Sequence, residues 1–156
     1  MRPLPEGSPA PLFEAPMSAG GVMRLSDYHG KKNVVLFFFP KDFTPGCTRQ
    51  VCLFRDFSAV FEKLDAAIFG ISYDGISTHE RFVGRYNLPF TLLTDVDRSI
   101  SRSYGVARLN GLLPLVKRVT FVIDKEGVIR GVVHQEADID RHIDEVLAAV
   151  RDLPPG

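Results

Sequence analysis

The sequence is poor in cysteine and free of tryptophan, and neither sign of charge is in excess. It has two cysteines among 156 residues, and 19 basic side chains balance 19 acidic ones. Nucleic acids and anionic membranes bind basic surfaces, so this balance argues against both as the main partner. The longest apolar run covers only residues 34–39, far short of the roughly 20 residues that span a bilayer. We therefore expect neither a nucleic-acid-binding protein nor a membrane protein.

The N-terminus also lacks the features of a secretory signal. Residues 2–9 are polar and rich in proline, with no apolar stretch. We therefore expect a cytoplasmic protein whose thiols are kept reduced. Two cysteines in that setting are buried bystanders, metal ligands or redox-active groups.

The spacing of potential ligands argues against a bound metal or cofactor. The four histidines are scattered and share no ligand spacing with the cysteines. The Cys-x4-Cys pair lacks the second half of a zinc site, and no Gly-rich phosphate loop is present. We expect neither a metal nor a cofactor.

The remaining pattern predicts a single α/β domain over residues 1–156, with an extended, Pro-rich stretch at 1–10. Residues 34–39 are apolar without polar alternation, which is typical of a strand buried on both faces in the middle of a covered sheet. Helical and strand periodicities then alternate, which implies parallel crossovers, and a late hairpin adds an antiparallel edge. The expected fold is a mixed sheet with helices on both faces. Strands are expected at 12–15, 22–25, 34–39, 66–72, 90–93, 119–123 and 128–133, and helices at 47–64, 78–86, 99–104 and, capped by Asp138, 139–150.

Cys47 lies where the buried strand has ended and a helix begins. The N–H groups and dipole of a helix N-terminus favour a thiolate over a thiol, and Thr44 is close enough in sequence to direct its hydroxyl at the sulfur. Ionisation alone gains little, because a free thiol is already about 3% ionised at pH 7 and can gain only about 30-fold. A reactive site also needs a donor for charge that develops in the transition state. An arginine suits that role, because it stays charged and offers a fork of N–H groups, but the sequence does not single out which one.

An isolated cysteine in such a place is more often a small buried side chain than a reactive one. The surrounding pattern Pro-x-x-x-Thr-x-x-Cys argues against that interpretation. Residues 40–48, Pro-Lys-Asp-Phe-Thr-Pro-Gly-Cys-Thr, resemble the active-site loop of the peroxiredoxins. With residues 52–56, Cys-Leu-Phe-Arg-Asp, they are similar to the peroxiredoxin Q, or bacterioferritin-comigratory protein, subfamily. The likeness extends from about Leu12 to Val150 and includes residues 37–40, 70–74, 88–95, 104–106 and 118–124.

The resemblance implies a thioredoxin fold of the peroxiredoxin type with an N-terminal β-hairpin extension, no cofactor, and reduction of hydrogen peroxide and organic hydroperoxides. It implies that Cys47 is the peroxidatic cysteine, which becomes a sulfenic acid. Thr44 would hold the thiolate and the peroxide, Pro40 would shield the site from water, and Arg118 matches the active-site arginine.

Two positions depart from the usual pattern of the family. Gln50 stands where a glutamate is usual three residues after the peroxidatic cysteine, and Phe39 stands where relatives often have tyrosine. Gln50 can accept a hydrogen bond but adds no negative charge.

Cys52 matches the resolving cysteine of several relatives. Residues five apart on an ideal helix have Cα atoms about 8.6 Å apart, whereas a disulfide needs less than about 7 Å. A Cys47–Cys52 bridge would therefore require unwinding from about Thr44 to Phe54. Thioredoxin or a similar dithiol would then reduce the bridge. The resemblance also implies a monomer rather than a dimer.

Two other interpretations stay open. In the first, Cys52 is only a core thiol, and Cys47 is resolved by an external thiol in a one-cysteine cycle. The second is a thioredoxin-like disulfide oxidoreductase, although that class needs Cys-x-x-Cys. Residues 110–114, with their glycine and proline, predict a mobile loop near Arg118.

Overall fold

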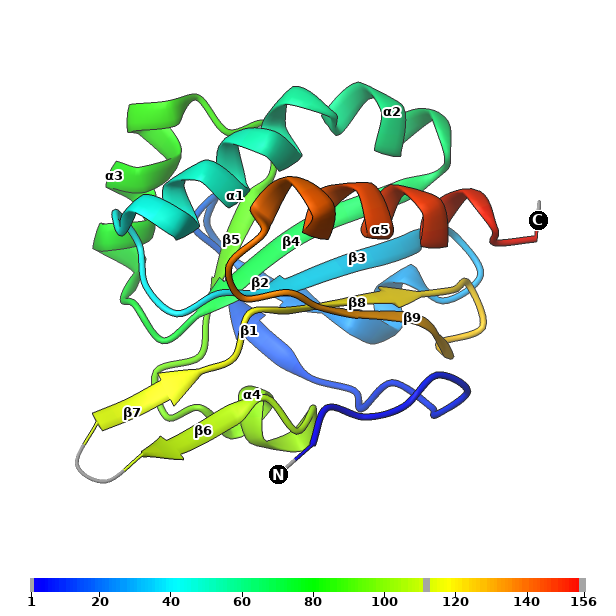
Figure 1. Ribbon diagram of the computed structural model, residues 1–156, viewed down its shortest axis with the longest axis horizontal. Helices are drawn as coiled ribbons and strands as arrows, with labels where there is room; N and C mark the ends of the chain where they lie inside the picture. The colour runs from blue at the N-terminus through cyan, green and yellow to red at the C-terminus, as the bar shows by residue number, and fades with distance from the viewer. Residues whose placement is uncertain (1, 111–112, 155–156) are drawn as a thin grey trace.

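The computed structural model describes residues 2–110 and 113–154, and its centre is a five-stranded mixed sheet in the order β5-β4-β3-β8-β9 (Figure 1). Strand β3 pairs in parallel with β4 and antiparallel with β8, so it occupies the middle of the sheet. Strand β5 extends the parallel side and β9 the antiparallel side. The strands are β3 Asn33–Phe38, β4 Ala66–Ser72, β5 Thr91–Thr94, β8 Val119–Ile123 and β9 Ile129–His134.

Every residue of β3 is buried, which explains why its sequence is apolar without alternation. Val35 and Phe37 pack into the core on one face of the sheet, and Leu36 and Phe38 pack into the core on the other. Helices α1, α2, α3 and α5 cover the first face, whereas the N-terminal hairpin, a 3₁₀ helix and α4 cover the second. The helices are α1 Pro45–Asp56, α2 Ser58–Lys63, α3 Ile76–Tyr86, α4 Ser99–Ser103, α5 Ile139–Arg151 and the 3₁₀ helix Leu25–Tyr28.

The predicted mixed sheet with helices on both faces is confirmed, as is the N-terminal hairpin. Strands β1 Glu14–Pro16 and β2 Val22–Arg24 pair antiparallel. The Asp138 side chain accepts a hydrogen bond from the backbone N–H of Arg141, as expected of the N-cap of α5.

Two local predictions were wrong. The helix expected over 47–64 is divided at Phe57, whose φ of −99° and ψ of 7° end α1 before α2 begins. The segment expected as a loop instead contributes to a second hairpin, in which β6 Ala107–Asn110 pairs with β7 Leu113–Val116. A proline can lie in such a two-stranded ribbon, since each strand has a free edge. Residues 111 and 112 of the predicted loop lie outside the described residues.

Within the part of the chain that the structure describes, we find no helix with the length and apolar character needed to cross a bilayer.

His142 on α5 is fully buried between the helix and the sheet. Its Nδ1 lies 3.1 Å from the carbonyl oxygen of Gln135, so this nitrogen carries the proton and donates. Its Nε2 lies 2.6 Å from the Thr120 hydroxyl on β8, from which it can accept. Burial chiefly, and to a lesser degree the charge of Arg118, lowers the pKa of His142 below 6.5. The imidazole is therefore neutral in the folded protein near neutral pH.

Replacing His142 with glutamine should flatten the acid side of the stability curve. Below about pH 6.5 the unfolded chain protonates this histidine while the folded protein does not, so the wild-type protein loses stability as the pH falls. The slope should decrease by up to about 1.4 kcal/mol per pH unit, the value for one proton. Urea unfolding between about pH 5 and pH 7.5 measures it. His29→Gln, at an exposed position, is the control, and equal slopes for wild type and His142→Gln would contradict the prediction.

Candidate active site

The loop of residues 40–44 carries the chain from the end of β3 into α1. Pro40 is half-buried at its start. Phe43 has a φ of +65°, in the left-handed region that bulky residues rarely adopt, and its ring centroid lies 4.8 Å from that of Phe82 on α3. Thr44 returns to an extended conformation at the N-cap of α1, and Pro45 begins the helix. The loop therefore makes a sharp, strained turn directly before the helix.

Cys47 lies in the first turn of α1 and is fully buried. The first helical hydrogen bond runs from the N–H of Thr48 to the carbonyl oxygen of Thr44 at 2.8 Å. N–H groups earlier in the turn have no intrahelical acceptor. The expected position of Cys47 at a helix start is confirmed, and the positive end of the helix dipole faces that region.

Arg118 lies directly before β8 and is buried against the same thiol. Its Nη2 is 3.4 Å from the Sγ of Cys47, and its Nη1 is 2.5 Å from the Oε1 of Gln50. Its backbone N–H donates to a carboxylate oxygen of Glu136 at 3.2 Å. A guanidinium in contact with a sulfur favours negative charge there, both on the thiolate and on atoms that react with it.

Gln50 is fully buried and holds one arm of the Arg118 fork through its amide oxygen. Among the described residues, neither the Nε2 of Gln50 nor the Nε of Arg118 has a hydrogen-bond partner. Because Gln50 is neutral, its contact orients the guanidinium without cancelling the positive charge. Two buried nitrogen donors thus remain unused on the side chains that contact each other next to Cys47.

The sequence suggested that Thr44 directs its hydroxyl at the Cys47 sulfur. In the structure the proton of this hydroxyl points elsewhere. The hydroxyl donates instead to the carbonyl oxygen of Lys41 at 2.8 Å. A hydroxyl has one proton, and this one closes the turn from Lys41 to Thr44. The lone pairs of the Thr44 oxygen remain able to accept a hydrogen bond.

Cys52 is half-buried on the same helix as Cys47, and both thiols are free. Helix α1 is continuous from Pro45 to Asp56, so the two Cα atoms are separated by about 8.6 Å if the helix is ideal. That separation exceeds the limit of about 7 Å for a disulfide. The structure is thus that of a reduced form in which the two sulfurs cannot bond.

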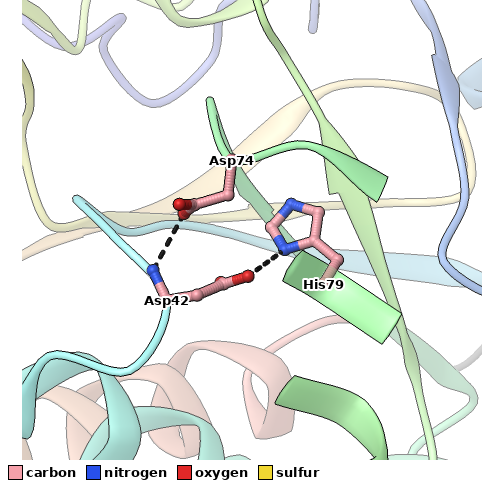
Figure 2. Close-up of side chains that lie close together, drawn as sticks. All are labelled: Asp42, Asp74 and His79. Atoms are coloured by element: carbon pink, nitrogen blue, oxygen red, sulfur yellow. Dashed lines mark hydrogen bonds and ion pairs between the residues drawn. The ribbon is translucent and has the colours of Figure 1, made fainter. Parts of the chain in front are cut away.

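A cluster of two buried residues, Asp42 and His79, and the half-buried Asp74 lies beside the loop and escaped the sequence analysis. Asp42 accepts through Oδ2 at 2.6 Å from His79 Nδ1, and its backbone N–H donates to Asp74 Oδ2 at 2.8 Å (Figure 2). These three side chains have ligand atoms within 4.8 Å of one another, but hydrogen bonds between them account for that closeness. The one available signal was that His79 shares an apolar helix face with Phe82, a pattern that indicates only burial.

Comparison with known proteins identifies the family. The sequence profile described as the AhpC/TSA family matches residues 7–132. The chain belongs to this family. The putative peroxiredoxin bcp of Coxiella burnetii is 42% identical over 145 residues, which is 90% of this chain and 95% of the relative. The chloroplastic peroxiredoxin Q of Populus jackii is 42% identical over 149 residues, 95% of this chain and 68% of the relative.

Solved structures agree with this membership. Peroxidoxin BcpB from Mycobacterium tuberculosis superposes with a TM-score of 0.90 at 35% identity, covering 99% of this chain and 100% of that one. Peroxiredoxin Q from Xanthomonas campestris gives a TM-score of 0.83 at 28% identity, covering 89% of each chain. The predicted family and the thioredoxin fold of the peroxiredoxin type are confirmed. The chain is a thiol-dependent peroxidase, an oxidoreductase that takes a peroxide and a thiol reductant.

Replacing Gly46 with alanine should lower peroxide turnover without lowering stability. A Cβ at this position would lie 3.0 Å from Nη2 of Arg118, so the guanidinium must shift by a few tenths of an ångström. The helix itself gains up to about 1 kcal/mol from alanine, while misplacement of the guanidinium should cost about threefold to tenfold in turnover. Thermal unfolding and a steady-state peroxidase assay check both effects.

Gly84→Ala is the matched control, since a Cβ there meets nothing within 4 Å on α3. Equal turnover of the Gly46 and Gly84 variants would show that the position of Arg118 does not matter.

Proposed function

We propose that the sulfur of Cys47 attacks the peroxide and that Cys52 resolves the product. The observation that carries the first part is the 3.4 Å contact between the Cys47 sulfur and Nη2 of Arg118 in a buried site at a helix N-terminus. A cation and helix N–H groups gathered around one thiol support a nucleophilic thiolate.

In the first step the Cys47 thiolate attacks one oxygen of the O–O bond. An S–O bond forms and the O–O bond breaks, so the sulfur is oxidised to a sulfenic acid. The other oxygen departs with the electron pair, takes a proton, and leaves as water or an alcohol. Arg118 stabilises the charge on the oxygens during this transfer. Thr44 accepts a hydrogen bond from the peroxide, and Pro40 at the loop start limits access of water.

In the second step the Cys52 thiolate attacks the sulfur of the Cys47 sulfenic acid: the S–S bond forms, the S–O bond breaks, and the departing hydroxide takes a proton to become water. The distance between the cysteines on an intact α1 requires the first turns of the helix to unwind before this bond forms. Thioredoxin or a similar dithiol then returns two electrons by thiol–disulfide exchange. We place the cycle in a monomer in a reducing compartment such as the cytoplasm, without a metal or cofactor.

A one-cysteine cycle is the second candidate. The observation in its favour is that Cys52 is half-buried in the core packing of an intact helix, where a structural thiol would also lie. An external thiol would then reduce the Cys47 sulfenic acid directly. A thioredoxin-like disulfide oxidoreductase is disfavoured, because its two cysteines would need the closer Cys-x-x-Cys spacing.

Mass spectrometry after one equivalent of hydrogen peroxide separates these cycles. Wild-type protein should show a Cys47–Cys52 disulfide, Cys52→Ser should accumulate sulfenic acid at Cys47, and Cys47→Ser should take up no oxygen and lose turnover in a thioredoxin-coupled assay. Sulfenic acid at Cys47 beside a free Cys52 in wild-type protein would exclude the internal bridge. Full turnover by Cys47→Ser would exclude Cys47 as the attacking residue.

Loss of Arg118 should slow the first step strongly. Arg118→Gln removes the charge beside the sulfur and should reduce the rate constant for oxidation of Cys47 by about 10²- to 10³-fold, the usual cost of a lost oxyanion donor. Arg118→Lys keeps the positive charge but not the forked pair of N–H donors. Its rate constant for oxidation of Cys47 should lie between those of Arg118→Gln and wild type. Stopped-flow mixing with peroxide measures these rates. Arg49→Gln, which breaks an exposed ion pair with Asp140, is the control, and a rate for Arg118→Gln within twofold of that control would refute the role.

A further inference from the structure

We propose that the buried Asp42–His79 pair is a positioning pair for Cys47, whose hydrogen bond holds the loop of residues 40–44 in the conformation that attacks peroxide and breaks when α1 unwinds. The second half of this proposal rests on the proposed Cys52 resolving step. Neither residue touches the sulfur, so both would act through the loop.

Asp42 is the anchored point of the loop. It lies between the end of β3 and Cys47, and its side chain is fully buried. Its carboxylate binds Nδ1 of His79 at 2.6 Å, and its backbone N–H binds Oδ2 of Asp74 at 2.8 Å. Figure 2 shows Asp42 reaching both partners from the loop. The side chain of Asp42 is therefore held by His79, and its main chain is held by Asp74, a residue of a different segment.

The partners of Asp42 are fixed to the body of the protein. His79 on α3 is fully buried, and its Nε2 donates to the carbonyl oxygen of Leu93 on β5 at 3.0 Å. Asp74 follows β4, and its Oδ2 also accepts from the Ser72 hydroxyl at 2.6 Å. The loop of residues 40–44 can thus move while its partners stay in place, His79 on α3 and Asp74 in the segment between β4 and α3.

The hydrogen bond between the pair contains one proton. The carbonyl of Leu93 can only accept, so Nε2 of His79 carries hydrogen. Nδ1 and Asp42 Oδ2, at 2.6 Å, then share a single proton, as imidazolium and carboxylate or as imidazole and carboxylic acid. Burial raises the pKa of Asp42, while the bond to His79 and its charge oppose that rise and the charge of Asp74 adds to it. An asparagine at position 42 can replace this bond, because its amide N–H can donate to a neutral His79.

Phe43, the residue after Asp42, favours release of the loop rather than its anchoring. Phe43 is held at a φ of +65°, which is unfavourable for a side chain of this size. Phe43 is 45% exposed as a residue, so its contact with Phe82 buries it only in part. A strained, half-exposed residue next to a buried anchor suggests a loop that leaves this conformation once the anchor is lost.

The two chemical steps should respond oppositely to loss of the anchor. Peroxide attack needs the Cys47 sulfur and the Arg118 guanidinium held in the correct relative position, so a loosened loop slows the attack. Disulfide formation needs the unwound form, so the same loosening accelerates it. General destabilisation of the fold gives no reason for opposite changes.

Stopped-flow kinetics on the full chain tests this proposal. The rate of Cys47 oxidation by hydrogen peroxide is measured in a Cys52→Ser background, and the rate of disulfide formation is measured with both cysteines present. Asp42→Ala should lower the first rate and raise the second, each by about tenfold. Asp42→Asn should restore both rates to within about threefold of wild type, because the hydrogen bond returns without the charge. Glu14→Ala, which removes an exposed carboxylate from β1, is the control.

His79→Gln is the second variant, in case Asp42→Ala fails to fold. A glutamine can still donate to Leu93 from the place of Nε2 but does not reach Asp42, so its rates should change as those of Asp42→Ala. Unchanged rates in a folded variant, a parallel fall of both rates, or a failure of Asp42→Asn to recover would overturn the proposal.

Failure of the proposed function itself is distinguishable. If wild-type protein forms no disulfide, the resolving role of Cys52 is wrong, and the positioning role is decided by the first rate alone. The positioning role is then supported if the oxidation rate of Cys47 decreases in Asp42→Ala and His79→Gln and recovers in Asp42→Asn. An unchanged oxidation rate would refute it.

Discussion

The contact between Arg118 and the Cys47 sulfur depends on the antiparallel pairing of β3 with β8. That pairing sets Phe38 opposite Val119, so the residue before Val119 lies beside the point where β3 ends and the loop to α1 begins. A shift of one residue would turn the Arg118 side chain to the other face of the sheet. The register is fixed by packing, because a slip would exchange the side chains that fit the two buried cores on either face of β3. The core of the protein therefore determines the distance between the cation and the sulfur.

The same site has two incompatible requirements if Cys52 is the resolving residue. Attack on peroxide needs Cys47 held rigidly in the first turn of α1, whereas the disulfide needs that turn to open. A loop fixed by a few buried hydrogen bonds and containing one strained residue suits both requirements. It is ordered while Asp42 is anchored, and its opening costs few apolar contacts because Phe43 is already half-exposed. A loop buried by large side chains throughout would be rigid but could not open.

The fold and the location of Cys47 were predictable from the sequence because they follow from local patterns. An unalternating apolar segment marked β3, and the change from strand to helix period placed the cysteine. Arg118 is 71 positions from Cys47, and only the resemblance to a family selected it. The Asp42–His79 pair was missed because a loop aspartate and a helix histidine 37 positions apart leave no periodic signal. Only the direction of the Thr44 hydroxyl proton was misjudged, because this hydroxyl donates to the Lys41 carbonyl oxygen within the turn.

Gln50 shows how a departure from the usual pattern of the family alters the electrostatics while keeping the geometry. Its amide oxygen holds Nη1 of Arg118 as a carboxylate oxygen would. A carboxylate there would also place a negative charge beside the thiolate, and two unit charges about 4 Å apart interact by about 4 kcal/mol at an effective dielectric constant of 20. A neutral amide avoids that repulsion and leaves the guanidinium charge undivided for the sulfur and the departing oxygen. The same neutrality weakens the hold on Arg118, since an amide oxygen accepts from the guanidinium without the ion pairing that a carboxylate would add. The buried walls of the site must therefore supply more of the orientation of the arginine than a glutamate partner would require.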